Sequence, residues 1–159
     1  MLNLKINGKE YTLEYSFASA EHNDTVKHMF NVVSGVYVMK EISNVKSEKD
    51  FNVAMMKGTS EMVADIPKIV KCCFYSGLLE NHGVSEEEAY DLMKSYMKEN
   101  KISYRKLFED IKGCMETDGF FDLSGLVEML AEMESNIEQS VKKMPKTPQD
   151  HKKKSTGTK

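Results

Sequence analysis

Residues 2–17, LNLKINGKEYTLEYSF, decide the fold, because they predict a β-hairpin at the head of a chain that otherwise predicts helices. The central pair Asn7-Gly8 tolerates the positive φ angles of a type I′ turn, and apolar residues alternate along both arms. A two-stranded hairpin alone is marginally stable in water, so we expect helices to cover its apolar face or another strand to join its edge. The expected cross-strand pairs are Leu2 with Leu13, Leu4 with Tyr11 and Lys5 with Glu10.

The length and composition of the chain predict one domain in a reducing compartment. Its 159 residues suffice for one core, and 40% of them are apolar. Three cysteines make no disulfide framework, and the N-terminal residues do not form an apolar signal segment. Apolar runs stay far shorter than the roughly 20 residues that span a bilayer. These features favour a cytoplasmic protein outside the membrane.

The net charge of −3 is unevenly distributed. Residues 141–159 hold seven lysines and one aspartate, a net +6, which leaves −9 for residues 1–140. An acidic body argues against a folded nucleic-acid platform. We expect a single domain over residues 1–144, with the hairpin at residues 2–15, and a disordered basic tail over residues 145–159.

Helix signals sharpen from residue 65. Asp65 suits an N-cap, Pro67 suits the first turn, and Gly83 suits the position beyond the end. Before that, an apolar spacing of four, three and four residues between positions 26 and 37 favours a helix, although the β-branched residues there suit a strand equally well. Residues 31–53 as a whole have no pattern that assigns them a structure.

Three more helices are expected after residue 84. Ser85 and Glu88 form a capping box for SEEEAYDLMKSYMKEN, and Ser103 caps SYRKLFEDIKGCM, which ends before Gly119. A last helix stops before Pro145. The apolar face of that helix comprises Leu123, Leu126, Val127, Leu130, Met133, Ile137 and Val141. The expected fold class is mainly α: a helical domain with an N-terminal β-hairpin and a disordered C-terminal tail.

Candidate catalytic and metal-binding patterns are incomplete. When DGFFDLSGLVEM is counted as a calcium loop from its first aspartate, the sixth residue is Leu123 instead of glycine and the twelfth is Met129 instead of glutamate. Adjacent Cys72 and Cys73 have the wrong spacing for two ligands of one zinc ion, so buried thiols are expected. Four histidines share no ligand spacing, and Glu86–Glu88 complement a helix dipole. We expect no enzymatic activity, no metal and no cofactor.

Twelve methionines are the unusual feature of the composition. Filling gaps in a core is the more common role of any one of them, but these flexible side chains also form surfaces that adapt to varied apolar partners. The GFF corner and the last helix offer more large apolar residues than a small domain buries, and such a surplus marks a binding site. The expected partner-binding residues are Phe120, Phe121, Met129 and Met133.

Two segments of the chain resemble a known family. Leu4 to Phe17 and His82 to Met93, with a looser likeness of the helices up to about residue 141, resemble the tail assembly chaperones of long-tailed bacteriophages. The resemblance implies a protein that binds the long helical tape measure protein, keeps it soluble and helps recruit the tail tube protein during virion assembly. It also implies a place in the cytoplasm of the infected bacterial host and not in the mature virion. In this family a frameshift often yields a longer second product.

Because one small domain covers little of such a partner, we also expect a homo-oligomer. A second hypothesis is a small helical adaptor or regulatory protein that binds a host or phage protein, and a third is a structural component of the virion. Co-purification with a very long helical partner separates the first hypothesis from the second. Presence in purified particles identifies the third.

Overall fold

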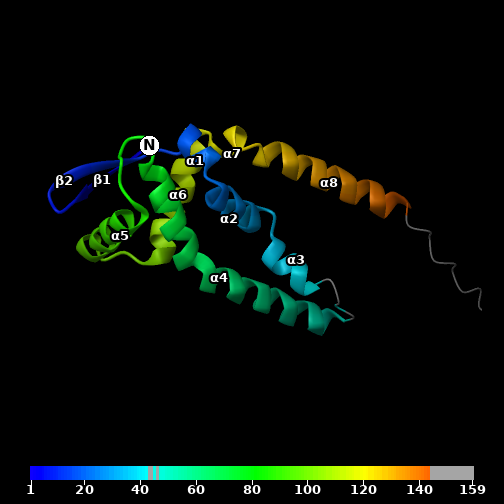
Figure 1. Cartoon of the computed structure of the whole chain (residues 1–159). Helices are drawn as coiled ribbons and strands as arrows, with labels where there is room; N and C mark the ends of the chain where they lie inside the picture. The colour runs from blue at the N-terminus through cyan, green and yellow to red at the C-terminus, as the bar shows by residue number, and fades with distance from the viewer. Residues whose placement is uncertain (43–44, 46, 144–159) are drawn as a thin grey trace, which may run out of the picture.

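The computed structural model describes residues 1–42, 45 and 47–143, and side chains up to residue 136. Within these residues the chain is mainly helical with one N-terminal two-stranded hairpin, which confirms the expected fold class (Figure 1). The expected tail at residues 145–159 lies outside the described residues. The elements are β1 (Leu2–Ile6), β2 (Lys9–Leu13), α1 (Phe17–Glu21), α2 (Asn23–Val33), α3 (Val36–Ile42), α4 (Glu48–Leu78), α5 (Glu86–Asn100), α6 (Tyr104–Asp118), α7 (Phe120–Leu123) and α8 (Leu126–Lys143).

The hairpin has the register that its sequence predicts. β1 and β2 are antiparallel, and all three expected cross-strand pairs are formed. Asn7 and Gly8 have φ angles of 51° and 78°, which lie in the left-handed region that a type I′ turn requires. The turn and the alternation therefore agree on one register.

The apolar face of the hairpin packs on helices. The residues that this face buries, none more than 2% exposed, are Leu4, Ile6, Leu13 and Tyr15. Beside β2, the amide of Glu14 donates to the carbonyl of Gly77 in α4 (2.8 Å). The hydroxyl of Tyr15 donates to the carbonyl of Cys73 one turn earlier (3.1 Å). Within the described residues, helices rather than a third strand stabilise the hairpin.

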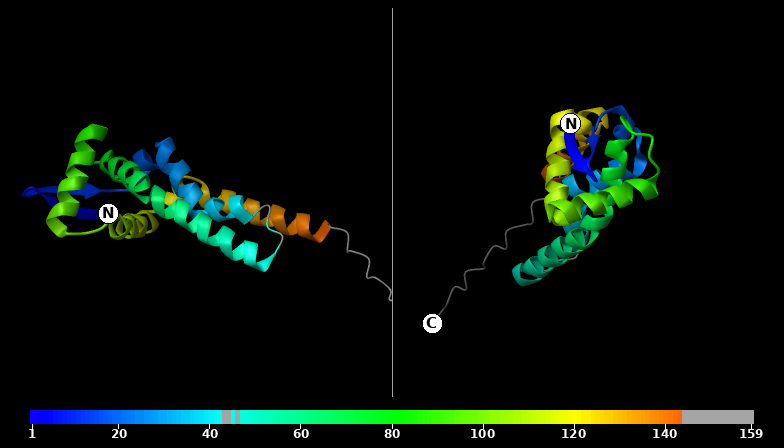
Figure 2. Two further views of the ribbon diagram at one scale, coloured as in Figure 1. Left: turned by 90° about the horizontal axis from the view of Figure 1, so that it is seen from below. Right: turned by 90° about the vertical axis from the view of Figure 1, so that its left-hand side faces the viewer.

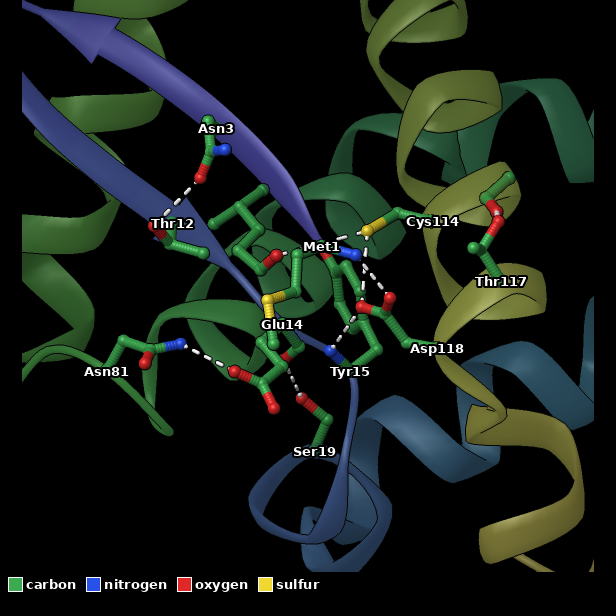
Figure 3. Close-up of polar contacts among 12 residues, drawn as sticks. Met1, Asn3, Thr12, Glu14, Tyr15, Ser19, Asn81, Cys114, Thr117 and Asp118 are labelled. Atoms are coloured by element: carbon green, nitrogen blue, oxygen red, sulfur yellow. Dashed lines mark hydrogen bonds and ion pairs between the residues drawn. The ribbon is translucent and has the colours of Figure 1, made fainter.

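Asp118, the last residue of α6, holds the chain just beyond β2 (Figure 3). Its Oδ2 accepts the amide of Tyr15 (3.0 Å) and the thiol of Cys114 (3.3 Å), and its Oδ1 pairs with the N-terminal amine of Met1. The Asp118 side chain is only 9% exposed, and this burial on its own raises the pKa of the carboxyl. Hydrogen bonds from the three partners outweigh burial and lower the pKa of Asp118 below its ordinary value.

We expect Asp118→Asn to lower the free energy of unfolding at neutral pH by about 1–2 kcal/mol, because these bonds lose a charged acceptor. Since the pKa of Asp118 is lowered in the folded state, its contribution is complete above the ordinary pKa of 3.8 and is lost as the pH falls through the folded value. The difference between parent and variant should therefore shrink below about pH 4. Urea denaturation at neutral and acid pH measures it, with exposed Asp122→Asn as control. Equal effects of the two variants would contradict this role of Asp118.

The helices α5 and α6 begin where their caps predict. Ser85 Oγ accepts the amide of Glu88 (3.2 Å), and Glu88 Oε2 accepts the amide of Ser85 (2.8 Å), which completes the capping box. Ser103 Oγ accepts the amide of Lys106 (3.2 Å), and Gly119, with a φ of 79°, ends α6. Both helices pack on α4, and α5 also packs on β1.

The helix expected from residue 65 to residue 83 differs at both ends. α4 begins at Glu48 and ends at Leu78, so the prediction is wrong by more than four turns at the N-terminal end. Ser47 is the true N-cap, and its Oγ accepts the amide of Asp50 (3.2 Å). Ser47 caps α4 as Ser85 and Ser103 cap α5 and α6, but it lies in residues 31–53, to which no sequence pattern assigned a structure.

Pro67 lies inside α4 and does not start it. A proline in a helix removes one backbone hydrogen bond, but buried Ile66 and Ile69 on either side hold the helix in the core. Asp65 is not a cap. Its Oδ2 accepts the hydroxyl of Tyr37 in α3 (2.9 Å), so this carboxylate joins two helices.

Between the hairpin and α4 the described residues form three helices, α1, α2 and α3, joined by short turns, in agreement with the helix that the apolar spacing between positions 26 and 37 favours. Gly35, with a φ of 68°, separates α2 from α3, which packs back along α4. A Cβ on Gly58 would lie 2.6 Å from the carbonyl oxygen of Tyr37 and 2.8 Å from the Cα of Val38. The two helices therefore meet backbone to backbone, where a side chain at position 58 does not fit.

The last predicted helix is divided in two by Gly125, which has a φ of 71°. Leu123 belongs to α7, and the side chains of Ile137 and Val141 lie outside the described part. Two segments project from the body in the same general direction (Figures 1 and 2). One is the arm, which we define as α3 with residues 48–64 of α4, and the other is α8.

Candidate functional site

A polar hollow of about 200 Å³ brings Cys72 of α4 near His22 and His28. Cys72 Sγ lies 3.4 Å from Thr25 Oγ1 and 4.0 Å from His22 Nδ1. Burial raises the pKa of Cys72, so the thiol is protonated at neutral pH and is a weak nucleophile. Burial, with a contribution from Lys68, lowers the pKa of His28 and keeps its ring neutral. The thiol in this hollow is therefore not activated by its surroundings.

Cys73 is a buried thiol, as expected, and so is Cys114, whereas Cys72 is only partly buried. Cys73 is 0% exposed and Cys114 is 8% exposed. Burial raises the pKa of Cys73 well above its ordinary value and that of Cys114 to about 11. Among the residues that the structure describes, no three His, Cys, Asp or Glu side chains are placed to hold one metal ion. None of the described helices is both long enough and apolar enough to cross a membrane.

Of the four expected partner-binding residues, Phe120 belongs to the core. It is 0% exposed, and its ring meets that of Phe121 edge-on, with 5.4 Å between the ring centroids. α7 packs against α1 and α6, and Phe120 is one of the residues of the buried core cluster. The expectation that Phe120 binds a partner is therefore corrected, because its side chain offers no surface.

The remaining three residues lie at or near the surface. Phe121 is half-buried at the edge of the core, Met133 is half-buried, and Met129 is 41% exposed. Met129, Leu130 and Met133 share one face of α8 with buried Leu126, because they are spaced three, four and seven residues from it. We call Met129, Leu130 and Met133 the α8 stripe. Within the described residues α8 packs mainly on α7, and Figure 1 shows the helix extending away from the body beyond this contact.

A second apolar surface lies on the arm, and the sequence predictions did not include it. Met56 is 75% exposed, Val63 51% and Met55 37%. With Thr59 and Ser60 these residues line a shallow hollow of about 430 Å³. We call the five residues the α4 strip. The strip lies in residues that precede the helix predicted from residue 65, so the sequence predicted no apolar face there.

The α4 strip contains no charged residue. Between positions 51 and 64 only Lys57 and Glu61 are charged. Lys57 Nζ pairs with Glu41 of α3 (2.7 Å), and Glu61 lines a hollow on the α3 side of the arm together with Tyr37. Both charges therefore lie toward α3. Once residues 51–64 are placed on a helix, the absence of charge at positions 55, 56, 59, 60 and 63 is the sequence signal by which the strip can be found.

No protein-family model matches the chain, and neither a curated protein nor a solved structure matches it. The resemblance of two short segments to tail assembly chaperones therefore stays a hypothesis. In the fold these segments are in contact, because the amide of Thr12 donates to His82 Nε2 (2.9 Å) and the Tyr11 and His82 rings lie 5.3 Å apart between centroids.

Proposed function

We propose that this chain is a tail assembly chaperone of a long-tailed bacteriophage, which binds the tape measure protein through the α8 stripe and helps recruit tail tube protein. The observation that supports this most is the stripe itself: a partly exposed apolar face on a helix that packs mainly on α7 and extends from the body (Figure 1). A helix that extends from the body without tertiary contacts is only marginally stable in water. A partner helix laid along it would bury the exposed apolar area.

The composition of α8 suits a helical partner that is apolar before assembly. Met129 and Met133 have flexible side chains that adapt to different apolar contacts, as a partner of varied sequence requires. The remainder of the described part of α8 includes the acidic residues Glu128, Glu132 and Glu134. Glu128 lies on the side of α8 away from the stripe, whereas Glu132 follows Met129 by three residues and Glu134 follows Leu130 by four, so these two flank the stripe. The three charges keep the remainder of the helix hydrated when a partner lies along the stripe. Binding of this kind needs neither a catalytic group nor a cofactor, and we propose that the chain has neither.

The proposal also places the protein in the cytoplasm of the infected host and excludes it from the mature virion. A tape measure chain exposes apolar helical faces until the tail tube encloses it, so a cover is needed only during assembly. The tube subunits then displace the chaperone. Purified virions should therefore lack this chain.

Co-expression with the tape measure protein tests the proposed function. We expect the tape measure protein to be soluble only when this chain is present, and we expect the double variant Met129→Asp, Met133→Asp to reduce its soluble fraction at least tenfold, because two charges would lie in the contact. The matched control, Ala131→Asp with Ser135→Asp, adds the same charges at the same spacing on exposed positions away from the stripe. Both variants should unfold like the parent, within about 0.5 kcal/mol, since the changed residues lie outside the core.

Two outcomes would contradict the proposal. One is a tape measure protein that stays soluble without this chain. The other is equal soluble yield with the stripe variant and the control. In either case the adaptor hypothesis, in which the helices bind one smaller host or phage protein, replaces it.

A further inference from the structure

The apolar face of α4 continues from the core into the arm. In the second half of the helix, Ile66, Val70 and Phe74 lie on this face and are at most 8% exposed. One turn and three turns earlier, Val63 and Met56 extend the same three-and-four spacing but are 51% and 75% exposed. The body thus covers only half of this face, and the other half is the α4 strip.

The charges of the chain restrict what can cover the strip. Residues 144–159 do not fit, because they contain five lysines and no large apolar residue after Met144. A charged partner helix would lose hydration against an uncharged surface without gaining an ion pair. A second copy of this chain presents the same uncharged strip, so the two surfaces match with no charge buried.

We propose that two copies of the chain pair through their α4 strips in an antiparallel, two-fold symmetric dimer. Thr59 and Ser60 lie at the centre of the strip, and their small side chains allow the helices to approach closely. With the axis between them, Met56 of one copy lies opposite Val63 of the second copy, and the reverse holds by symmetry. Each α4 keeps α3 on its other side, so the two arms form a four-helix arrangement.

The dimer is expected to be weak. The strip runs from residue 55 to residue 63, about 12 Å of helix, so the pair lies at the low end of specific interfaces. No residue of the α8 stripe takes part in the proposed pairing. The proposed pairing therefore does not depend on the proposed function, and it can be tested on the purified chain alone.

Sedimentation across a concentration series measures the pairing. We expect the parent to shift from monomer to dimer between about 1 and 100 µM, and Met56→Glu to remain monomeric at every concentration. Met129→Glu, on the α8 stripe, is the control and should dimerise like the parent. A parent that is monomeric throughout, a Met56→Glu variant that still dimerises, or growth beyond the dimer would overturn the proposal.

Cysteine cross-linking provides the second measurement and does not depend on how Met56→Glu behaves. Across the proposed axis, residue 60 of one copy and residue 60 of the second copy are offset by about 2 Å along the helix direction. The two residues 64 are offset from each other by about 13 Å. Ser60→Cys should therefore form a covalent dimer under mild oxidation, and Ala64→Cys and the parent should not. Equal cross-linking at positions 60 and 64 would contradict the register.

Discussion

Replacing Leu13 with aspartate is expected to lower the free energy of unfolding by about 3 kcal/mol or more. Leu13 is 0% exposed and lies in the contact between the hairpin and the helices. A carboxylate there either stays charged without a partner or takes up a proton against its ordinary pKa, and both are unfavourable. Urea denaturation followed by circular dichroism measures the loss.

The matched control adds the same charge to the other face of the same hairpin. Asn3 is exposed, and its Oδ1 accepts the hydroxyl of Thr12 (3.0 Å), a role that aspartate can keep. Asn3→Asp should change the free energy of unfolding by no more than about 0.5 kcal/mol. If Leu13→Asp and Asn3→Asp unfold alike, the hairpin does not stabilise the helices, and the docking described above is incorrect.

Gly77→Ala is expected to destabilise the fold by about 2–3 kcal/mol, although alanine favours helices. A Cβ at position 77 would lie 2.7 Å from Cζ and 2.8 Å from the hydroxyl oxygen of Tyr15. The Tyr15 ring cannot move aside easily, because it is 0% exposed and its hydroxyl is bonded to the carbonyl of Cys73. Either the ring or α4 must shift, and the hairpin contact loosens.

Gly113→Ala is the control, and the same substitution should have the opposite sign there. Gly113 lies inside α6, is exposed, and no atom lies within 4 Å of its expected Cβ. Alanine should stabilise the fold by about 0.5–1 kcal/mol at this site. Thermal unfolding of the two variants measures the contrast, and a stabilising effect of Gly77→Ala would show that Tyr15 does not pack as described.

Local signals predicted the elements whose ends depend on a few neighbouring residues. Asn7-Gly8 set the hairpin register because only one pairing satisfies both the turn and the alternation. Ser85 and Ser103 marked the starts of α5 and α6 because a capping oxygen and its amide lie three residues apart in sequence. Such contacts are visible in the sequence before any tertiary packing is known.

The predictions that were wrong concern residues whose structure depends on contacts with residues distant in sequence. Pro67 suggested a helix start, yet packing on both sides keeps α4 continuous through it. Asp65 suggested a cap, yet its carboxylate accepts the Tyr37 hydroxyl from 28 residues away. Phe120 and Phe121 looked alike in sequence, and the packing of α7 on the body buries one and leaves the other at the edge. The α4 strip was not predicted because its residues were assigned no helix, and their apolar spacing forms a surface only on a helix.

The most direct measurement of the proposed function is affinity purification of the tagged chain from cells that are assembling phage tails, with the co-purified proteins identified and quantified. We expect the tape measure protein to be recovered with the parent and with the Ala131→Asp, Ser135→Asp control. With Met129→Asp, Met133→Asp we expect at least a tenfold loss of recovered tape measure protein. Absence of the tape measure protein from the parent, or its equal recovery with both variants, would contradict the account.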